Sequence, residues 1–265
     1  MRGNVVTLTY LGGPTALLEW RGVRLLTDPT FDPAGTRYEL PVYTLRKTQG
    51  PALASAAVGH VDAVLLSHDH HFDNLDHAGR AVLGTAGRVV TTVEGAERLG
   101  GRSEGLAPWQ QATLAAGDGG RLSIVATPAR HGPAHPDRGP VVGFALAFAD
   151  EPGSVVYVSG DTVWYEGVAE VARRFEPQLA LLNLGAARVS AVGASPLTFT
   201  AAEAVEAARA MPAASIVPLH FEGWEHFTES RADVEAAFRT ARLAERLLWP
   251  QRGKPLQLDL LHASS

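Results

Sequence analysis

Apolar and polar residues alternate in short runs at the start of the chain, a pattern typical of β-strands. Three such runs open the sequence, at residues 5–10, 15–20 and 23–27. Gly12-Gly13-Pro14 and Arg21-Gly22 separate them and favour tight turns, so an antiparallel meander is predicted. The polar stretch 30–52 contains prolines that cannot continue a strand ladder, and it predicts a long loop.

After residue 60 the pattern changes to apolar runs that alternate with amphipathic segments. Strands are predicted at 61–67, 88–92, 110–114, 121–127, 141–148, 154–159, 179–184, 215–219 and 256–261. Helices are predicted at 76–83, 94–99, 167–175, 201–211 and 230–242. The helix at 201–211 begins with a cap from Thr198 or Thr200, with Glu203 in its first turn. These elements predict one α/β (α+β) domain, residues 1–265, built as a four-layer αββα sandwich.

The strand predicted at 61–67 ends in a dense group of metal-binding side chains. From His68 to Asp76, nine residues contain three histidines and three aspartates. Imidazole and carboxylate groups bind Zn²⁺ and similar metals, and residues two apart on a chain leaving a strand can face one pocket. The candidate ligands in this segment are His68, His70, His71 and Asp73.

Three further predicted strands lead into residues of the same kind, namely His131, Asp161 and His220. Each of these residues alone is compatible with an ordinary loop, turn or buried hydrogen bond. If the four strand ends converge along one edge of the sandwich, however, their side chains surround one cavity. The recurrence of metal-binding residues at strand ends therefore indicates a single site.

Composition narrows the chemistry. With 46% hydrophobic residues, the 265-residue chain can bury a substantial core, and a net charge of −5 without a basic patch argues against nucleic acid as a partner. The absence of cysteine restricts metal ligands to nitrogen and oxygen. Neither a signal peptide nor a run long enough to span a bilayer is present, so we expect no transmembrane segment and a cytoplasmic location.

The sequence resembles the metallo-β-lactamase-fold hydrolases, and within them the ascorbate-6-phosphate lactonase-like and N-acylphosphatidylethanolamine phospholipase D-like branch. The matching segments are Leu11-Gly12-Gly13 to Asp28-Pro29, Ser67-His68-Asp69-His70 to Asp76, His131, Ser159-Gly160-Asp161-Thr162 and Pro218-Leu219-His220. The resemblance implies hydrolysis of a small molecule by a metal-activated water. It also implies one or two divalent ions as cofactors, zinc first, with manganese or iron as alternatives.

The resemblance further implies a role for each candidate ligand. His131 would complete a first metal site with the His68 cluster, Asp161 would bridge two metals, and His220 would complete the second site. Asp73 would be a ligand of the second site that also holds the attacking water and helps to deprotonate it. No substrate-binding residue follows from the resemblance.

The chain departs from the family's pattern at Gly13, where relatives of this branch often carry histidine, and again after His68. The pattern His-x-His-x-Asp-His places its ligands at i, i+2, i+4 and i+5, whereas Asp73 arrives one residue late when the count begins at His68. Either one residue is inserted, so that His70 or His71 lies outside the frame, or the frame begins at Asp69. Both alternatives remain open from the sequence.

In either frame Asn74 stands where a second-site histidine is usual, and a neutral amide oxygen is a weaker ligand than imidazole for a borderline metal. Two functions therefore remain. The first is a metal-dependent hydrolase of an ester, lactone, amide or phosphodiester, and the second is a degenerate, non-catalytic metal- or ligand-binding protein.

A solvated loop is expected at 30–52. The alternative is that side chains of this loop contact the substrate, namely Arg37, Tyr38, Arg46 and Lys47. The candidate walls of a substrate pocket are Trp109, Trp164, Trp224 and His226.

Overall fold

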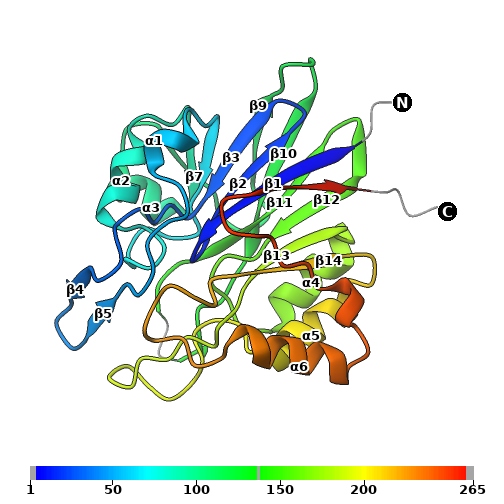
Figure 1. Ribbon diagram of the computed structural model, residues 1–265. Coiled ribbons are helices and arrows are strands. Elements are labelled where there is room, and N and C mark those ends of the chain that lie inside the picture. The colour runs from blue at the N-terminus through cyan, green and yellow to red at the C-terminus, as the bar shows by residue number, and fades with distance from the viewer. Residues whose placement is uncertain (1–3, 136–137, 261–265) are drawn as a thin grey trace.

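The computed structural model describes residues 4–135 and 138–260, and it shows two packed β-sheets with helices on their outer faces (Figure 1). The first sheet has seven strands in the order β15-β1-β2-β3-β6-β7-β8. Their bounds are β1 Val5–Gly12, β2 Thr15–Trp20, β3 Val23–Thr27, β6 Ala63–Leu65, β7 Val89–Thr91, β8 Ser103–Gly105 and β15 Pro255–Asp259. The predicted antiparallel meander forms β1 to β3, and β6 then pairs in parallel with β3.

The second sheet has six strands in the order β14-β13-β12-β11-β10-β9. Their bounds are β9 Gln111–Ala115, β10 Arg121–Pro128, β11 Val142–Phe148, β12 Glu151–Val158, β13 Leu179–Asn183 and β14 Ser215–Leu219. Strands β9 to β12 pair antiparallel, whereas β12, β13 and β14 pair in parallel. Parallel neighbours end at the same edge, which brings the residues after β12 and β14 to one side of the molecule.

Three apolar layers hold the sandwich together. Trp20, Phe144 and Phe148 are buried in the layer between the two sheets. The helices α1 (Ser55–Val58), α2 (His77–Leu83) and α3 (Val93–Leu99) lie beside β7, and α4 (Glu166–Phe175), α5 (Ala201–Ala210) and α6 (Arg231–Thr240) lie on the other sheet (Figure 1). A 3₁₀ turn, η1, spans Ala244–Arg246. The predicted four-layer αββα sandwich is confirmed, and burial of its apolar faces is the main stabilising contribution.

Polar residues cap α5 and α6, as the sequence predicts. Thr200, and not Thr198, caps α5 in a reciprocal capping box with Glu203. The Thr198 hydroxyl instead donates to the Leu184 carbonyl at 2.7 Å. Asp76 caps α2 by accepting a hydrogen bond from the Gly79 amide at 2.7 Å. No helix within the described ranges is both long and apolar enough to cross a membrane.

The prediction of a plain loop at 30–52 is wrong in part, because this segment contains the hairpin β4 (Arg37–Glu39) and β5 (Thr44–Arg46). Two of its candidate substrate contacts are buried. The Tyr38 hydroxyl donates to Asp32 at 2.7 Å, and the Lys47 ammonium donates to Asp76 at 2.8 Å. Strands of three residues give too little alternation to be recognised. The short helix α1 and the short strand β8 were not predicted either, because each has too few residues to show a periodic pattern.

Candidate metal centre

The predicted ligands come together at the edge where four strands end. His68, His131 and Asp161 each lie three residues beyond β6, β10 and β12, and His220 follows β14 directly. In the described part of the chain, three sets of side chains have ligand atoms within 4.8 Å of one another. These sets are His68 with His70 and His71, His68 with His131 and Asp161, and Asp73 with Asp161 and His220. All seven candidate residues are therefore in this cluster.

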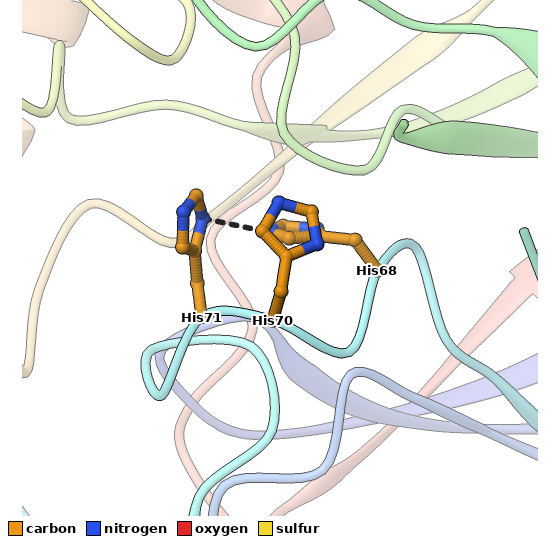
Figure 2. Close-up of side chains that lie close together, drawn as sticks. All are labelled: His68, His70 and His71. Carbon is orange, nitrogen blue, oxygen red and sulfur yellow. Dashed lines mark hydrogen bonds between the residues drawn. The ribbon is translucent and has the colours of Figure 1, made fainter. Parts of the chain in front are cut away.

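The imidazoles of His68 and His71 are joined by a hydrogen bond (Figure 2). The Nε2 atom of His68 lies 2.9 Å from Nδ1 of His71, and Nδ1 of His68 lies 2.9 Å from the Ser67 hydroxyl. On the other side, Nδ1 of His131 donates to the Leu197 carbonyl at 2.8 Å. That bond leaves the lone pair on Nε2 of His131 for a ligand, because it fixes the tautomer and the ring orientation.

His70 and Asp69 are tied to groups outside this pair. Nε2 of His70 lies 3.0 Å from the Arg138 carbonyl oxygen, although its ring remains near His68 and His71 (Figure 2). Both carboxylate oxygens of Asp69 accept from Arg98, at 2.5 and 2.9 Å. Asp69 belongs to none of the three sets found among the described residues.

Asp73, Asp161 and His220 form the second half of the cluster. Oδ1 of Asp161 lies 2.9 Å from Nδ1 of His220 and also accepts from Asn183 at 2.8 Å. Nε2 of His220 lies 3.7 Å from Oδ2 of Asp73. The backbone of His220 has a φ of 52°, a strained value for a non-glycine residue that is typical of functional sites.

Two buried polar atoms here have no hydrogen-bond partner among the described residues: Oδ2 of Asp161 and Nε2 of His220. Buried polar atoms are rarely left unsatisfied, because each one loses its hydration without compensation. A cation bound by this carboxylate oxygen and this imidazole nitrogen would give both atoms a partner. The nitrogen and oxygen donors present therefore fit a divalent metal ion.

The ionisation states of His68, His71, Asp73 and Asp161 also suit a cation. For His220, burial lowers the pKa but the Asp161 carboxylate outweighs it, and the net pKa lies above its ordinary value. Burial, followed by the neighbouring imidazoles, lowers the pKa of His68 well below its ordinary value and that of His71 to about 3. Burial raises the pKa values of Asp73 and Asp161. The imidazoles of His226 and His220, respectively, lower these pKa values by a larger amount, so the net pKa of each carboxyl group lies below its ordinary value. Neutral imidazoles and ionised carboxylates are the forms that bind metals.

Asn74, which stands where a histidine is usual, lies beside Asp28. Its amide nitrogen lies 3.4 Å from Oδ2 of Asp28, and its side-chain oxygen is buried without a hydrogen-bond partner in the described part of the chain. Oδ1 of Asp28 accepts from the Ser67 amide at 2.7 Å, and burial raises the pKa of Asp28 to about 7. Asp28 and Asn74 thus connect β3 to the loop that carries the histidines.

The contact between His226 and Asp73 was not predicted from the sequence. His226 was a candidate pocket wall, and the structure places its Nε2 atom 3.0 Å from Oδ2 of Asp73. The signal was weak, because His226 follows no strand and lies six residues beyond His220. Its Nδ1 atom is buried and unpartnered within the described residues.

Two cavities walled by described residues reach His131 and His226 respectively. The larger, of about 570 Å³, has His131 in a wall that is otherwise mostly apolar and includes Leu106, Val141 and Tyr165. The smaller, of about 200 Å³, has His226 in its wall. The tryptophans that the sequence offered as walls lie elsewhere: Trp109 stacks near Phe175, Trp164 packs in the layer outside the second sheet, and Trp224 packs on Tyr38.

A four-layer αββα sandwich that gathers histidines and aspartates at its strand ends has the architecture of the metallo-β-lactamase fold. The sequence pattern that defines the family described as "Beta-lactamase superfamily domain" matches residues 23–221, so the chain belongs to this family. The narrower resemblance to the ascorbate-6-phosphate lactonase-like and phospholipase D-like branch stays a prediction.

Relatives of known sequence cover most of the chain. UPF0173 protein YddR of Bacillus subtilis is 25% identical over 260 residues, which are 94% of this chain and 98% of YddR. A UPF0173 metal-dependent hydrolase of Caldivirga maquilingensis is 27% identical over 237 residues, or 86% of each chain.

Solved structures share the fold. The isothiocyanate hydrolase from Delia radicum gut bacteria has a TM-score of 0.81 at 22% identity, with 96% of this chain and 100% of that chain covered. A possible metal-dependent hydrolase from Veillonella parvula has a TM-score of 0.80 at 20% identity, with 95% and 99% covered. Together with the family match, the relatives identify the chain as a metal-dependent hydrolase of the metallo-β-lactamase superfamily.

Proposed function

We propose that residues 1–265 act as one domain that hydrolyses an ester, lactone, amide or phosphodiester of a small molecule, with one or two divalent ions as cofactors. The observation that carries the proposal is the pair of buried, unpartnered ligand atoms on Asp161 and His220, beside the carboxylate of Asp73. Zinc suits the mixture of imidazole and carboxylate donors, and manganese or iron are the alternatives.

Each ligand has a proposed place. His68, His71 and His131 would hold the first ion, Asp73 and His220 the second, and Asp161 lies between the two sets and would contact both. His70 is the alternative to His71. A bound divalent ion supplies Lewis acidity, which lowers the pKa of a ligated water and polarises the bond to be cleaved.

The protein's own residues contribute orientation, proton transfer and exclusion of bulk water. Asp73 is ionised, so its carboxylate can accept a hydrogen bond from the attacking water and then its proton. Burial of His68, Asp161 and His220 keeps competing water away from the ligands. The larger cavity, with His131 in its wall, offers room for the apolar part of a small substrate.

The proposal is tested by metal content and by hydrolysis. Protein purified without chelator is expected to contain metal by elemental analysis and to cleave at least one chromogenic ester, lactone, amide or phosphodiester. Dialysis against EDTA should abolish hydrolysis, and Zn²⁺ or Mn²⁺ should restore it. A protein that stays metal-free and inert after loading with either ion would instead be a degenerate, non-catalytic member of the family.

We further propose His226 as a positioning residue for Asp73, because a ligating carboxylate is normally oriented by a hydrogen bond from a neighbouring group. His226→Leu is expected to lower kcat by about 10- to 100-fold and to weaken metal binding, measured by competition with a chelating dye. His226→Gln keeps an N–H donor at a similar reach and should retain most of both. If the leucine and glutamine variants lose the same amount of metal affinity, the hydrogen bond to Asp73 is not what His226 provides.

A further inference from the structure

The smaller cavity is formed by three segments that are distant in the sequence. The β4–β5 hairpin contributes Arg46, the loop after β13 contributes Arg188, and the loop after β14 contributes Glu225 and His226. The imidazole of His226 faces this cavity and also reaches Asp73, with Nε2 at 3.0 Å from the carboxylate. A molecule in the cavity therefore lies next to the proposed reaction centre.

The cavity wall carries excess positive charge. Neither Arg46 nor Arg188 has a carboxylate within 4.0 Å of its side-chain nitrogens in the described part of the chain, although ion pairs are common elsewhere on this surface. Glu225 is the one acidic residue in the wall; it is exposed and forms no ion pair with the described residues. Two guanidinium groups against one carboxylate leave the wall with a net positive charge beside the imidazole of His226.

Within its own hairpin, Arg46 lacks the counter-charge that the opposite arginine has. Arg46 lies directly opposite Arg37 in the register of β4 and β5, and directly opposed residues share a face. Like charges in this arrangement repel each other unless a counter-charge is present. Arg37 has one in Glu39, at 3.4 Å, whereas Arg46 has no protein carboxylate in range.

The segments that carry the arginines are tied together by main-chain hydrogen bonds. The Arg188 amide donates to the His226 carbonyl at 2.9 Å, and the Glu225 amide donates to the Arg46 carbonyl at 3.1 Å. The Arg188 guanidinium also donates to the Thr228 hydroxyl. The cavity wall is thus held in place before any ligand binds, which lowers the entropic cost of binding.

We propose that this cavity is an anion subsite, in which Arg46 and Arg188 bind a carboxylate or phosphate group of the substrate. The inference rests on the proposed function and makes it narrower: the substrate carries a negative group close to the bond that is cleaved on the Asp73 side of the cluster. Guanidinium groups suit this role because they donate paired N–H groups to planar or tetrahedral oxyanions.

Calorimetric titration of the metal-loaded protein with succinate and with inorganic phosphate tests binding, and the two ligands distinguish carboxylate from phosphate recognition. Loss of one charge-assisted contact should raise the Kd by about tenfold or more in Arg46→Gln or Arg188→Gln. Arg188→Lys, which retains the charge, should lose less. Arg37→Gln is the matched control, since it removes an arginine from the same hairpin but outside the cavity wall.

Hydrolysis of two esters tests whether an anionic group bound in the smaller cavity promotes cleavage at the proposed reaction centre. The wild-type protein is expected to prefer p-nitrophenyl succinate, which carries a distal carboxylate, over neutral p-nitrophenyl acetate, and each cavity variant should reduce that ratio of kcat/KM by about tenfold. The same Kd and the same ester ratio in wild-type, Arg46→Gln and Arg188→Gln proteins would overturn the subsite. Anion binding that depends on both arginines in a protein without metal or hydrolysis would instead overturn the proposed function and leave the subsite standing.

Discussion

Replacement of Asp161 by alanine is expected to remove most of the bound metal and to lower kcat/KM by more than about a hundredfold. Loss of residues that merely orient a ligand typically costs 10- to 100-fold, so loss of the ligand itself should cost more. Among the described residues, Asp161 is the one that belongs to sets on both sides of the cluster. Its removal also leaves Nδ1 of His220 and the Asn183 amide without their common acceptor.

Metal content by elemental analysis and steady-state hydrolysis measure this outcome on the same preparation. Asp69→Asn is a matched control, because it neutralises another buried aspartate near the cluster whose oxygens are bound to Arg98. It should keep the wild-type amount of metal. Retention of metal by the Asp161→Ala variant, with circular dichroism showing it folded, would remove the central ligand from the proposed site.

The sequence was sufficient to locate the cluster because each ligand follows a buried apolar strand. The runs before His68, His131, Asp161 and His220 have the length and composition of interior strands, and their order along the chain places them at one edge of an αββα sandwich. The helix caps were also predictable, since Thr200 and Glu203 have the spacing of a capping box.

Contacts between distant segments were not predictable in the same way. Lys47 was a candidate for substrate binding, but the fold buries it against Asp76, 29 residues further along the chain. His226 approaches Asp73 across more than half of the chain, and nothing in its local sequence marks that contact. Local pattern determines strands and caps, whereas pairing of side chains between loops depends on the finished fold.

The histidine frame is the clearest example, because spacing alone left His70, His71 and Asp69 as alternatives. The structure directs the Asp69 carboxylate to Arg98 and brings Nε2 of His70 to the Arg138 carbonyl. Nδ1 of His71 instead lies 2.9 Å from Nε2 of His68, a separation that two ligands of one ion can adopt with small adjustment (Figure 2).

His71→Ala and His70→Ala are therefore expected to differ sharply. His71→Ala should lose the metal bound beside His68 and lower kcat/KM by more than about a hundredfold, because no other described imidazole contacts Nε2 of His68 so closely. His70→Ala removes a contact to a loop carbonyl and should keep both metal and activity near the wild-type level.

The two variants are each other's control, since adjacent and partly buried histidines are truncated to the same side chain. Elemental analysis gives the metal stoichiometry, and the absorption spectrum of the cobalt-substituted protein reports whether an imidazole has left the coordination sphere. Loss of metal in the His70→Ala variant alone would move the inserted residue to His71. Equal and mild effects in both variants would mean that neither histidine is a ligand, and His68 and His131 would then have to hold the first ion with Asp161 alone.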